Sequence, residues 1–281
     1  MSAQVTQKIA FGLLTLMAVV VVVPIVLVVG YIVVQGLGAI SWEFLADFPR
    51  NGMKEGGILP AIIGTVLLTF GTAIASIPIA LGAAIYLAEY ARDTWLTRAI
   101  RLAIINLAGI PSVVYGLFGL GLFVLFLGFG ASIVAGSLTL GLMTMPVVIS
   151  TAEEALLTVP QRFRVVSRSL GASQWQTVRN VVLPNALPGI LTGVILGLER
   201  AAGETAPILF TAAAFYLPQL PQSALSPTMA LPYHLYVIAT QVPGMPLEIQ
   251  YGTALVLLVL VLGLNLVATV LRSRFRRRRQ W

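Results

Sequence analysis

The sequence of 281 residues contains no cysteine and a single histidine, His234. The absence of cysteine excludes disulfide bonds and thiolate metal sites, and one histidine cannot form a histidine-based metal site by itself. Charge is also scarce, because Asp, Glu, Lys and Arg make up 10% of the chain, against roughly 25% in soluble domains. With 58% hydrophobic residues and a mean hydropathy of +0.95, the composition indicates a polytopic membrane protein.

Sequence motifs typical of enzymes are missing as well. The chain has no G-x-x-x-x-G-K-[ST] loop to hold the phosphates of ATP, so any ATP hydrolysis must come from another polypeptide. It also has no soluble segment that carries paired carboxylates or a nucleophile with its base. We therefore expect a membrane protein that is not itself an enzyme and that holds no cofactor or metal.

Apolar runs long enough to cross a membrane occur six times. A span needs about 20 mostly apolar residues. The first run is too long for the core of a signal peptide, so we interpret it as a retained span. The predicted fold class is all-α, with six transmembrane helices. The runs are residues 9–34, 61–88, 102–127, 131–152, 187–213 and 251–271.

Basic residues are distributed unevenly among the connections. Fourteen of the 17 Lys and Arg residues precede the first run, follow the sixth, or lie between the second and third or the fourth and fifth. The other side has only Arg50 and Lys54, so the positive-inside rule predicts cytoplasmic N and C termini. Despite the net charge of +7, the C-terminal arginines are then a topology signal and an anchor to anionic lipids, not a nucleic-acid arm.

The external connections are residues 35–57, which are polar, and residues 214–249, which are rich in proline. The second of these contains an apolar piece, Met229 to Thr240, that is too short to span. We expect this piece to pack as a partial helix on the outer surface or to re-enter slightly.

The cytoplasmic connection between the fourth and fifth runs, residues 153–186, has a mixed apolar and basic character. Pro160 ends one helix, and Gly171 separates a short amphipathic pair of helices. Helical spacing places Phe163, Val166 and Leu170 on one face and Arg164 and Arg168 on another. Such a segment either lies on lipid or docks in the groove of a partner protein.

The spacing within this connection favours docking. Gly171 is followed ten residues later by Val181, and then by Leu183 and Pro184. This resembles the EAA loop of bacterial ABC importer permeases, with Val-Val-Ser at 165–167 in place of Glu-Ala-Ala. The resemblance implies the type I permease fold and a coupling helix that fits a cleft on an ATP-binding subunit. The residues expected at that contact are Phe163, Arg164, Arg168, Leu170, Gly171, Ala172, Trp175, Leu183 and Pro184.

Two further stretches narrow the resemblance. Residues 106–123, NLAGIPSVVYGLFGLGLF, resemble the third span of permeases of the Pst phosphate importer. Residues 187–212, LPGILTGVILGLERAAGETAPILFTA, resemble the fifth span of its A-type subunit. Glu199 departs from that pattern, in which a small apolar residue is usual. On this basis the chain divides into a first span with its external connection, a permease domain that contains the coupling loop 160–185, and a basic cytoplasmic tail: residues 1–60, 61–272 and 273–281.

The resemblance also implies a set of partners in the bacterial cytoplasmic membrane. These are a C-type permease subunit as the second half of a heterodimer, two ATPase subunits that bind ATP and magnesium, and an external phosphate-binding protein. The implied substrate is inorganic phosphate. Membrane lipids surround the complex, and nucleic acid has no part in it.

The fifth run has charges at its centre. Arg200 is 13 residues from either end of 187–213, about 20 Å of helix at 1.5 Å per residue, so its guanidinium must face protein or water. Glu204 lies one turn later and can neutralise the charge of Arg200. Glu199 needs another partner, which the companion subunit can supply. The pair is either a structural ion pair or a phosphate-passing site, because a guanidinium matches phosphate oxygens in bidentate geometry.

Backbone irregularities accompany these charges. Pro207 cannot donate to the carbonyl of Gly203, so the helix should kink or unwind between them. The third run has a matching irregularity at Gly109 and Pro111, whose polar neighbours either line the path or only satisfy the broken backbone. The candidate path residues are Arg200, Glu204, Thr205, Asn106, Ser112 and Tyr115, and the helix-packing residues are Gly189, Gly193, Gly197, Gly203 and Pro207.

Three other functions fit parts of the sequence. A secondary phosphate carrier would need repeats with paired broken spans, and the third and fifth runs are both interrupted, but it would have no use for the EAA-like loop. A permease for sulfate, molybdate or an organic solute would share the loop without evident need for Arg200 and Glu204. A structural scaffold is the weakest alternative, because mid-membrane charge is costly to retain.

Overall fold

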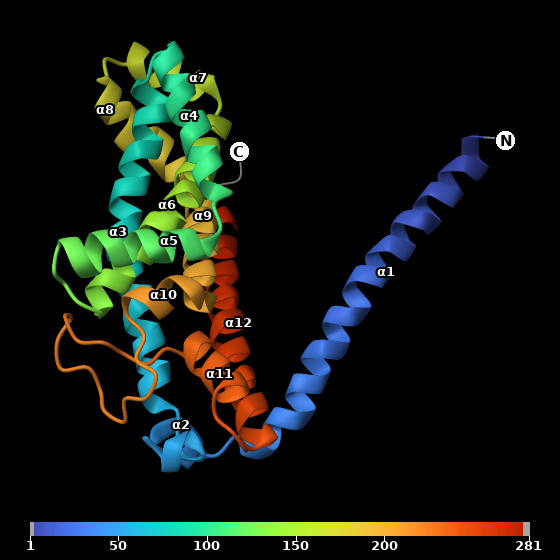
Figure 1. Cartoon of the computed structure of the whole chain (residues 1–281). Coiled ribbons are helices and arrows are strands. Elements are labelled where there is room, and N and C mark those ends of the chain that lie inside the picture. Colours follow the sequence, from blue (N-terminus) through green and yellow to red (C-terminus); the bar gives the residue numbers. More distant parts are fainter. Residues whose placement is uncertain (1–2, 278–281) are drawn as a thin grey trace.

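The computed structural model describes residues 3–277, and its chain is almost entirely helical (Figure 1). One two-residue antiparallel β-hairpin pairs Pro49 with Gly56 and Arg50 with Glu55. The helices are α1 (Ala3–Gly36), α2 (Trp42–Ala46), α3 (Leu59–Ile85), α4 (Trp95–Ala108), α5 (Ser112–Gly119), α6 (Ile133–Thr158), α7 (Gln161–Ser169), α8 (Gln174–Thr177), α9 (Leu183–Gly203), α10 (Ala206–Thr211), α11 (Leu231–Thr240) and α12 (Leu247–Arg277). The strands are β1 (Pro49–Arg50) and β2 (Glu55–Gly56), and the short turns are the 3-10 helices η1 (Leu37–Ala39) and η2 (Asn51–Met53) and the π-helices η3 (Tyr86–Tyr90), η4 (Leu120–Phe126) and η5 (Val178–Val182).

The described chain contains five continuous helices that are long and apolar enough to cross a membrane. A sixth span is interrupted, because α4 and the helix formed by α5 and η4 meet at an angle of 101°. The bend occurs at Gly109–Pro111, where Pro111 has no N–H to donate and restricts the residue before it. The predicted six spans are therefore found, but the third begins at Trp95 rather than residue 102 and is sharply bent.

The two ends of the molecule differ. η3, the start of α4, α7 and α8 gather at one end, here called the basic end, and α2, the β-hairpin and α11 lie toward the other, the opposite end (Figure 1). α1 and α12 meet near the opposite end and extend from there toward the basic end. α12 runs to Arg277, so the expected tail 273–281 begins inside a helix, and residues 278–281 lie outside the described residues.

α6 is the central helix, with α3 and α9 packed against it. Small residues allow these close approaches, because a Cβ on Gly71 of α3 would lie 2.2 Å from Oγ of Ser137, and one on Gly193 of α9 would lie 1.8 Å from Oγ1 of Thr151. Gly189 and Gly197 face α6 in the same way, so the glycines at four-residue spacing pack within the chain. These glycines place α9 against α6 along its length.

α1 is different, because it contacts mainly α12 and η1. Tyr31 meets Tyr251 edge-on with ring centroids 5.4 Å apart, and Gly36 lies against the backbone of Tyr251. Most of its described apolar side chains are exposed on this chain, and Figure 1 shows α1 diverging from the other helices. Exposed aliphatic side chains are compatible with lipid, which is as apolar as leucine.

The external apolar piece forms the short helix α11, which is not a span. It packs beside α3, where the N–H of Leu231 donates to Oγ1 of Thr65 at 2.8 Å. Gly64 makes room for this contact, because a Cβ there would lie 1.8 Å from the carbonyl oxygen of Met229. The predicted partial helix is confirmed, and most of its length is buried.

The contact between α6 and α9 can be tested by exchanging the sizes of two residues. We expect G193A to lower the melting temperature of the detergent-solubilised protein, with a cost of roughly 1–3 kcal/mol for overpacking. The double variant G193A/T151G should recover most of the loss. G263A is the control, because a Cβ at Gly263 meets no atom within 4 Å. Equal melting of G193A and G263A would contradict this packing.

His234 of α11 predicts a pH dependence of stability. It is 2% exposed, and burial lowers the pKa of its imidazole to about 4. From pH 6.5 down to about pH 4 the unfolded chain binds a proton that the folded chain does not, so stability falls as the pH falls, by about 3 kcal/mol in total. Thermal melting across this range should depend less on pH in H234N. Identical pH profiles of the wild type and H234N would refute the prediction.

Candidate translocation site and coupling loop

The fifth span is broken where the prolines and glycines predict it. α9 ends at Gly203, Glu204 is extended with ψ of 137°, and α10 begins at Ala206 with Pro207 in its first turn. At its other end, however, the helix continues without interruption through η5 into α8, so that it runs from Gln174 to Gly203. Arg200 therefore lies in the last turn of a 30-residue helix and not at the centre of a continuous helix over 187–213.

Two features let the helix continue through the predicted start of the span. Pro184 lies in the first turn of α9, just after the π-helix η5. A proline there removes an N–H, and the side-chain amide of Asn185 donates to the carbonyl of Val181 at 2.7 Å. The helix runs through this point without a break, so the loop between the fourth and fifth spans is joined to Arg200 by one helix.

Arg200 and Glu204 face each other across the break. Nε of Arg200 donates to Oε1 of Glu204 at 3.3 Å, and 36% of the arginine side chain and 17% of the glutamate side chain are exposed. Among the described residues this is the one hydrogen-bonded partner that the structure gives Arg200, so Nη1 and Nη2 remain available. A cation in the last turn also interacts favourably with the C-terminal carbonyls of α9.

The break in the third span lies close to this site. α5 crosses α10 at Gly116, where a Cβ would approach the carbonyl oxygen of Ala206 and Cα of Pro207 to 3.0 Å. Figure 1 shows α5 and α10 running across the molecule at a middle level, beside the end of α9. The structure thus brings together the second halves of both interrupted spans.

The remaining path candidates lie around these breaks. Tyr115 is 8% exposed, lies within electrostatic reach of Arg200, and donates its hydroxyl to the carbonyl of Leu107 at 2.8 Å, so it satisfies the broken backbone. Asn106 is exposed before the bend, while Ser112 and Thr205 are half-buried at the starts of α5 and α10.

Glu199 has its partner on the same chain. Its Oε2 accepts from Nδ2 of Asn265 in α12 at 3.2 Å, and Oδ1 of Asn265 accepts from Thr269 at 3.4 Å. Oε1 is buried and has no hydrogen-bond partner among the described residues. Glu199 therefore belongs to the contact between α9 and α12.

The predicted pair of short helices is confirmed as α7 and α8. Gly171 turns the chain between them with φ of +84°, a conformation that favours glycine. Ser173 and Gln176 form a capping box at the start of α8, and the hydroxyls of Ser167 and Thr177 lie 2.9 Å apart. These contacts define a compact helix-turn-helix, here called the coupling loop, at the basic end.

The side chains of the coupling loop divide into an outer and an inner set. Leu170 is 84% exposed, Trp175 is 53% exposed, and Arg168 is also exposed. Phe163 is half-buried and packs, as Leu183 does, against the core formed by α3, α6 and α9. Ala172 is half-buried in the turn, and Pro184 is half-buried in the first turn of α9.

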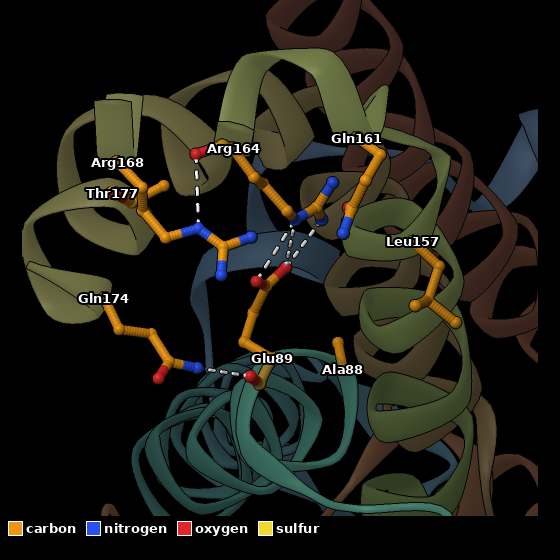
Figure 2. A pocket seen from close by; sticks show the side chains of 8 residues that line it. All are labelled: Ala88, Glu89, Leu157, Gln161, Arg164, Arg168, Gln174 and Thr177. Carbon is orange, nitrogen blue, oxygen red and sulfur yellow. Dashed lines mark hydrogen bonds and ion pairs between the residues drawn. The ribbon is translucent and has the colours of Figure 1, made fainter. Parts of the chain in front are cut away.

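Arg164 faces into the chain, which corrects its expected place on an outer face with Arg168. It is 7% exposed, and its Nη2 lies 2.6 Å from Oε1 of Glu89, the residue near the end of η3 (Figure 2). Sequence reasoning did not single out Glu89, because 75 residues separate the two and no local spacing connects them. Its one sequence signal is a carboxylate at the end of an apolar run.

Other charges at the basic end form two further pairs. Arg101 binds Glu153 at 2.8 Å and the carbonyl of Leu87 at 2.9 Å. Arg98 binds Asp93 on the surface, and hydrogen bonds from that guanidinium lower the pKa of the Asp93 carboxyl. Only the first of these pairs joins separate helices.

A family model described as "Binding-protein-dependent transport system inner membrane component" matches residues 76–281. The chain belongs to this family. Members are permease components of ABC importers, and the chain accordingly carries no ATPase motif of its own. The match covers the coupling loop and the broken spans.

Relatives of this family extend over most of the chain. A probable ABC transporter permease protein, YqgI of Bacillus subtilis (strain 168), is 33% identical over 95% of each chain. The probable phosphate transport system permease protein PstA of Methanocaldococcus jannaschii is 34% identical over 90% of this chain and 88% of its own length. PstA 1 of Mycobacterium tuberculosis (strain ATCC 25618 / H37Rv) is 32% identical over 93% and 86%. The resemblance to A-type phosphate permeases is therefore confirmed.

Solved structures support the fold. A structure of the MetNI methionine ABC transporter in an inward-facing conformation matches with a TM-score of 0.63 and 19% identity, over 78% of this chain and 95% of that chain. A structure of an amino acid ABC transporter matches with a TM-score of 0.54 and 18% identity, over 77% and 92%. The fold is that of an ABC importer permease, as predicted.

The geometry of the coupling loop predicts where an engineered disulfide can form. The chain has no cysteine, so S167C/T177C would introduce its only two thiols, where hydroxyl oxygens are 2.9 Å apart. We expect mild oxidation to link them, because a disulfide needs Cβ atoms about 3.5–4.5 Å apart. Loss of free thiols, measured by mass spectrometry, reports the link. In S169C/T177C one cysteine moves to another face of α7, so equal linking of both pairs would contradict the loop geometry.

Proposed function

We propose that this chain is the A-type permease subunit of an ATP-driven phosphate importer and that it passes inorganic phosphate across a bacterial cytoplasmic membrane. The single observation that carries the substrate is Arg200, an arginine with free Nη atoms at the meeting point of two broken spans. Relatives named as phosphate transport permeases support it. Membership of a binding-protein-dependent family argues against a secondary carrier.

Arg200 and Glu204 have different roles at the site. The guanidinium offers Nη1 and Nη2 to two phosphate oxygens, a bidentate geometry that lysine does not reproduce. Glu204 holds Nε through a long contact of 3.3 Å and lowers the net positive charge, so the anion is attracted but also released. Its carboxylate can also accept a hydrogen bond from a protonated phosphate oxygen.

The side chains of Arg200 and Glu204 are partly exposed on this chain, and in our proposal a second permease covers them and completes the path. That partner is a C-type subunit, which forms a heterodimer with this one. A phosphate-binding protein delivers the anion at the opposite end. At the basic end, which we assign to the cytoplasm together with both termini, the coupling loop docks on one of two ATPase subunits that bind ATP and magnesium. Leu170, Trp175 and Arg168 are exposed there for that contact.

Reconstitution of the complete complex in proteoliposomes tests this function. With binding protein outside and ATP inside, we expect uptake of radiolabelled phosphate and phosphate-stimulated ATP hydrolysis, neither matched by sulfate or molybdate. R200K should lower phosphate uptake by roughly tenfold or more, since hydrogen bonds to charged groups contribute about 1.5–3 kcal/mol. The variant keeps the charge but loses the fork of donors.

R98K is the matched control, because Arg98 forms an exposed ion pair at the basic end. It should transport phosphate at the wild-type rate. An assembled R200K complex with wild-type uptake would refute the role of Arg200. Uptake driven by sulfate or molybdate instead of phosphate would identify the chain as a permease for another oxyanion.

A further inference from the structure

A buried ion pair connects the coupling loop to the second span. Arg164 of α7 and Glu89 of η3 have side chains that are 8% and 7% exposed. Nη2 of Arg164 lies 2.6 Å from Oε1 of Glu89, and Nε lies 3.1 and 3.2 Å from the two carboxylate oxygens. This fork geometry fixes the orientation of both side chains (Figure 2).

The same guanidinium binds the end of α6. Its Nη1 donates to the carbonyl of Val159 at 2.5 Å, and Nη2 donates to the carbonyl of Leu156 at 2.8 Å. Carbonyls at the C-terminal end of a helix lack the usual donor four residues later. The carbonyl of Leu156 accepts only a long bond of 3.3 Å from the N–H of Val159, and the arginine adds a donor to both carbonyls. Arg164 thus joins α7 to both η3 and α6. From α8, the side chain of Gln174 donates to the carbonyl of Glu89 at 2.6 Å.

The pair lines a pocket at the basic end. A cavity of about 320 Å³ lies between η3, α6, α7 and α8, and both Glu89 and Arg164 line it. Figure 2 shows the two side chains reaching toward each other from opposite sides of this cavity. α7 packs mainly against α8 and η5, and Phe163 is its half-buried apolar contact with the core. The ion pair is therefore the principal polar link between α7 and the end of the second span.

The coupling loop is consequently attached to the membrane helices through both α7 and α8. α8 continues through η5 into α9, whose last turn carries Arg200, while α7 is bound through Arg164 to η3 and α6. Without Arg164, α7 would keep only its chain connection to α6, and the hydrogen bond from Gln174 would hold α8 to η3. A movement of α7 could then be absorbed by rotation at the turn around Gly171 or by bending at η5. With Arg164 in place, the loop moves together with α3, α6 and α9.

We propose that Glu89 and Arg164 are a positioning pair that makes the second and fourth spans follow the coupling loop, and thereby converts ATP hydrolysis by the partner into phosphate transport. This inference rests on the proposed function, in which the loop docks on an ATPase. Loss of the pair leaves the docking surface in place, because Leu170 and Trp175 are on the outer side of the loop. ATP hydrolysis then continues, but fewer anions are transported for each ATP hydrolysed.

E89Q and R164K test the pair in the complete complex in proteoliposomes. E89Q keeps the shape of the side chain without its charge, and R164K keeps the charge but cannot reach Glu89, Leu156 and Val159 together. The readouts are copurification of the ATPase, ATP hydrolysis, and anion taken up per ATP hydrolysed. We expect assembly and hydrolysis near the wild type and a loss of roughly tenfold in uptake per ATP.

D93N is the matched control. Asp93 and Arg98 form an ion pair at the same end of the molecule, but their side chains are 70% and 67% exposed. Exposed pairs contribute little, so D93N should keep the wild-type uptake per ATP. Wild-type coupling in E89Q and R164K would overturn the proposal. Failure of both variants to assemble would also overturn it, because the pair would then serve folding alone.

The wild-type complex tests the proposed function separately. If it takes up phosphate, the variants are compared with it on phosphate. If another anion drives uptake, the substrate assignment fails, and uptake per ATP is compared on that anion. The two proposals can therefore fail independently.

Discussion

The close packing of α6 between α3 and α9 holds the molecule together. Gly71 admits Ser137 on one side of α6, and Gly193 admits Thr151 on the other, at distances that no Cβ would allow. Lipid tails provide no hydrophobic drive for helix association, so such contacts depend on small residues and van der Waals packing. Because α6 also meets α4, α5 and α10, this three-helix contact sets the position of both interrupted spans.

Broken helices at membrane depth are possible only where protein satisfies the backbone. Tyr115 does so for Leu107 in the third span, and α5 packs against α10 just beyond the break in the fifth. Arg200 lies beside this junction at the end of the helix that begins in the coupling loop. The site and the loop are thus the two ends of one element, and Arg164 fastens the loop to its neighbours.

Local rules predicted much of this arrangement and missed its long-range parts. The length of the apolar runs predicted the spans. Pro207 and Gly203 predicted the break in the fifth span and Gly171 predicted the turn in the coupling loop, because each of these residues acts on its own backbone. The continuation of α9 into the loop was missed, since Pro184 is tolerated in the first turn of α9 and no local pattern indicates the π-helix before it. The pairing of Glu89 with Arg164 was missed because it depends on how α3 and α7 meet in space. The same limit applies to the 101° bend, because Pro111 predicts an interruption but not its angle.

The rigid connection between the coupling loop and the second span can be measured directly by electron paramagnetic resonance. The chain has no native cysteine, so spin labels at V165C on α7 and Y90C on η3 report one distance, and both positions are exposed. In an assembled complex that hydrolyses ATP and transports phosphate, we predict one narrow distance distribution that is the same without nucleotide and with ATP bound. A distribution that shifts or broadens when ATP binds would contradict it, because the loop would then move independently of α3.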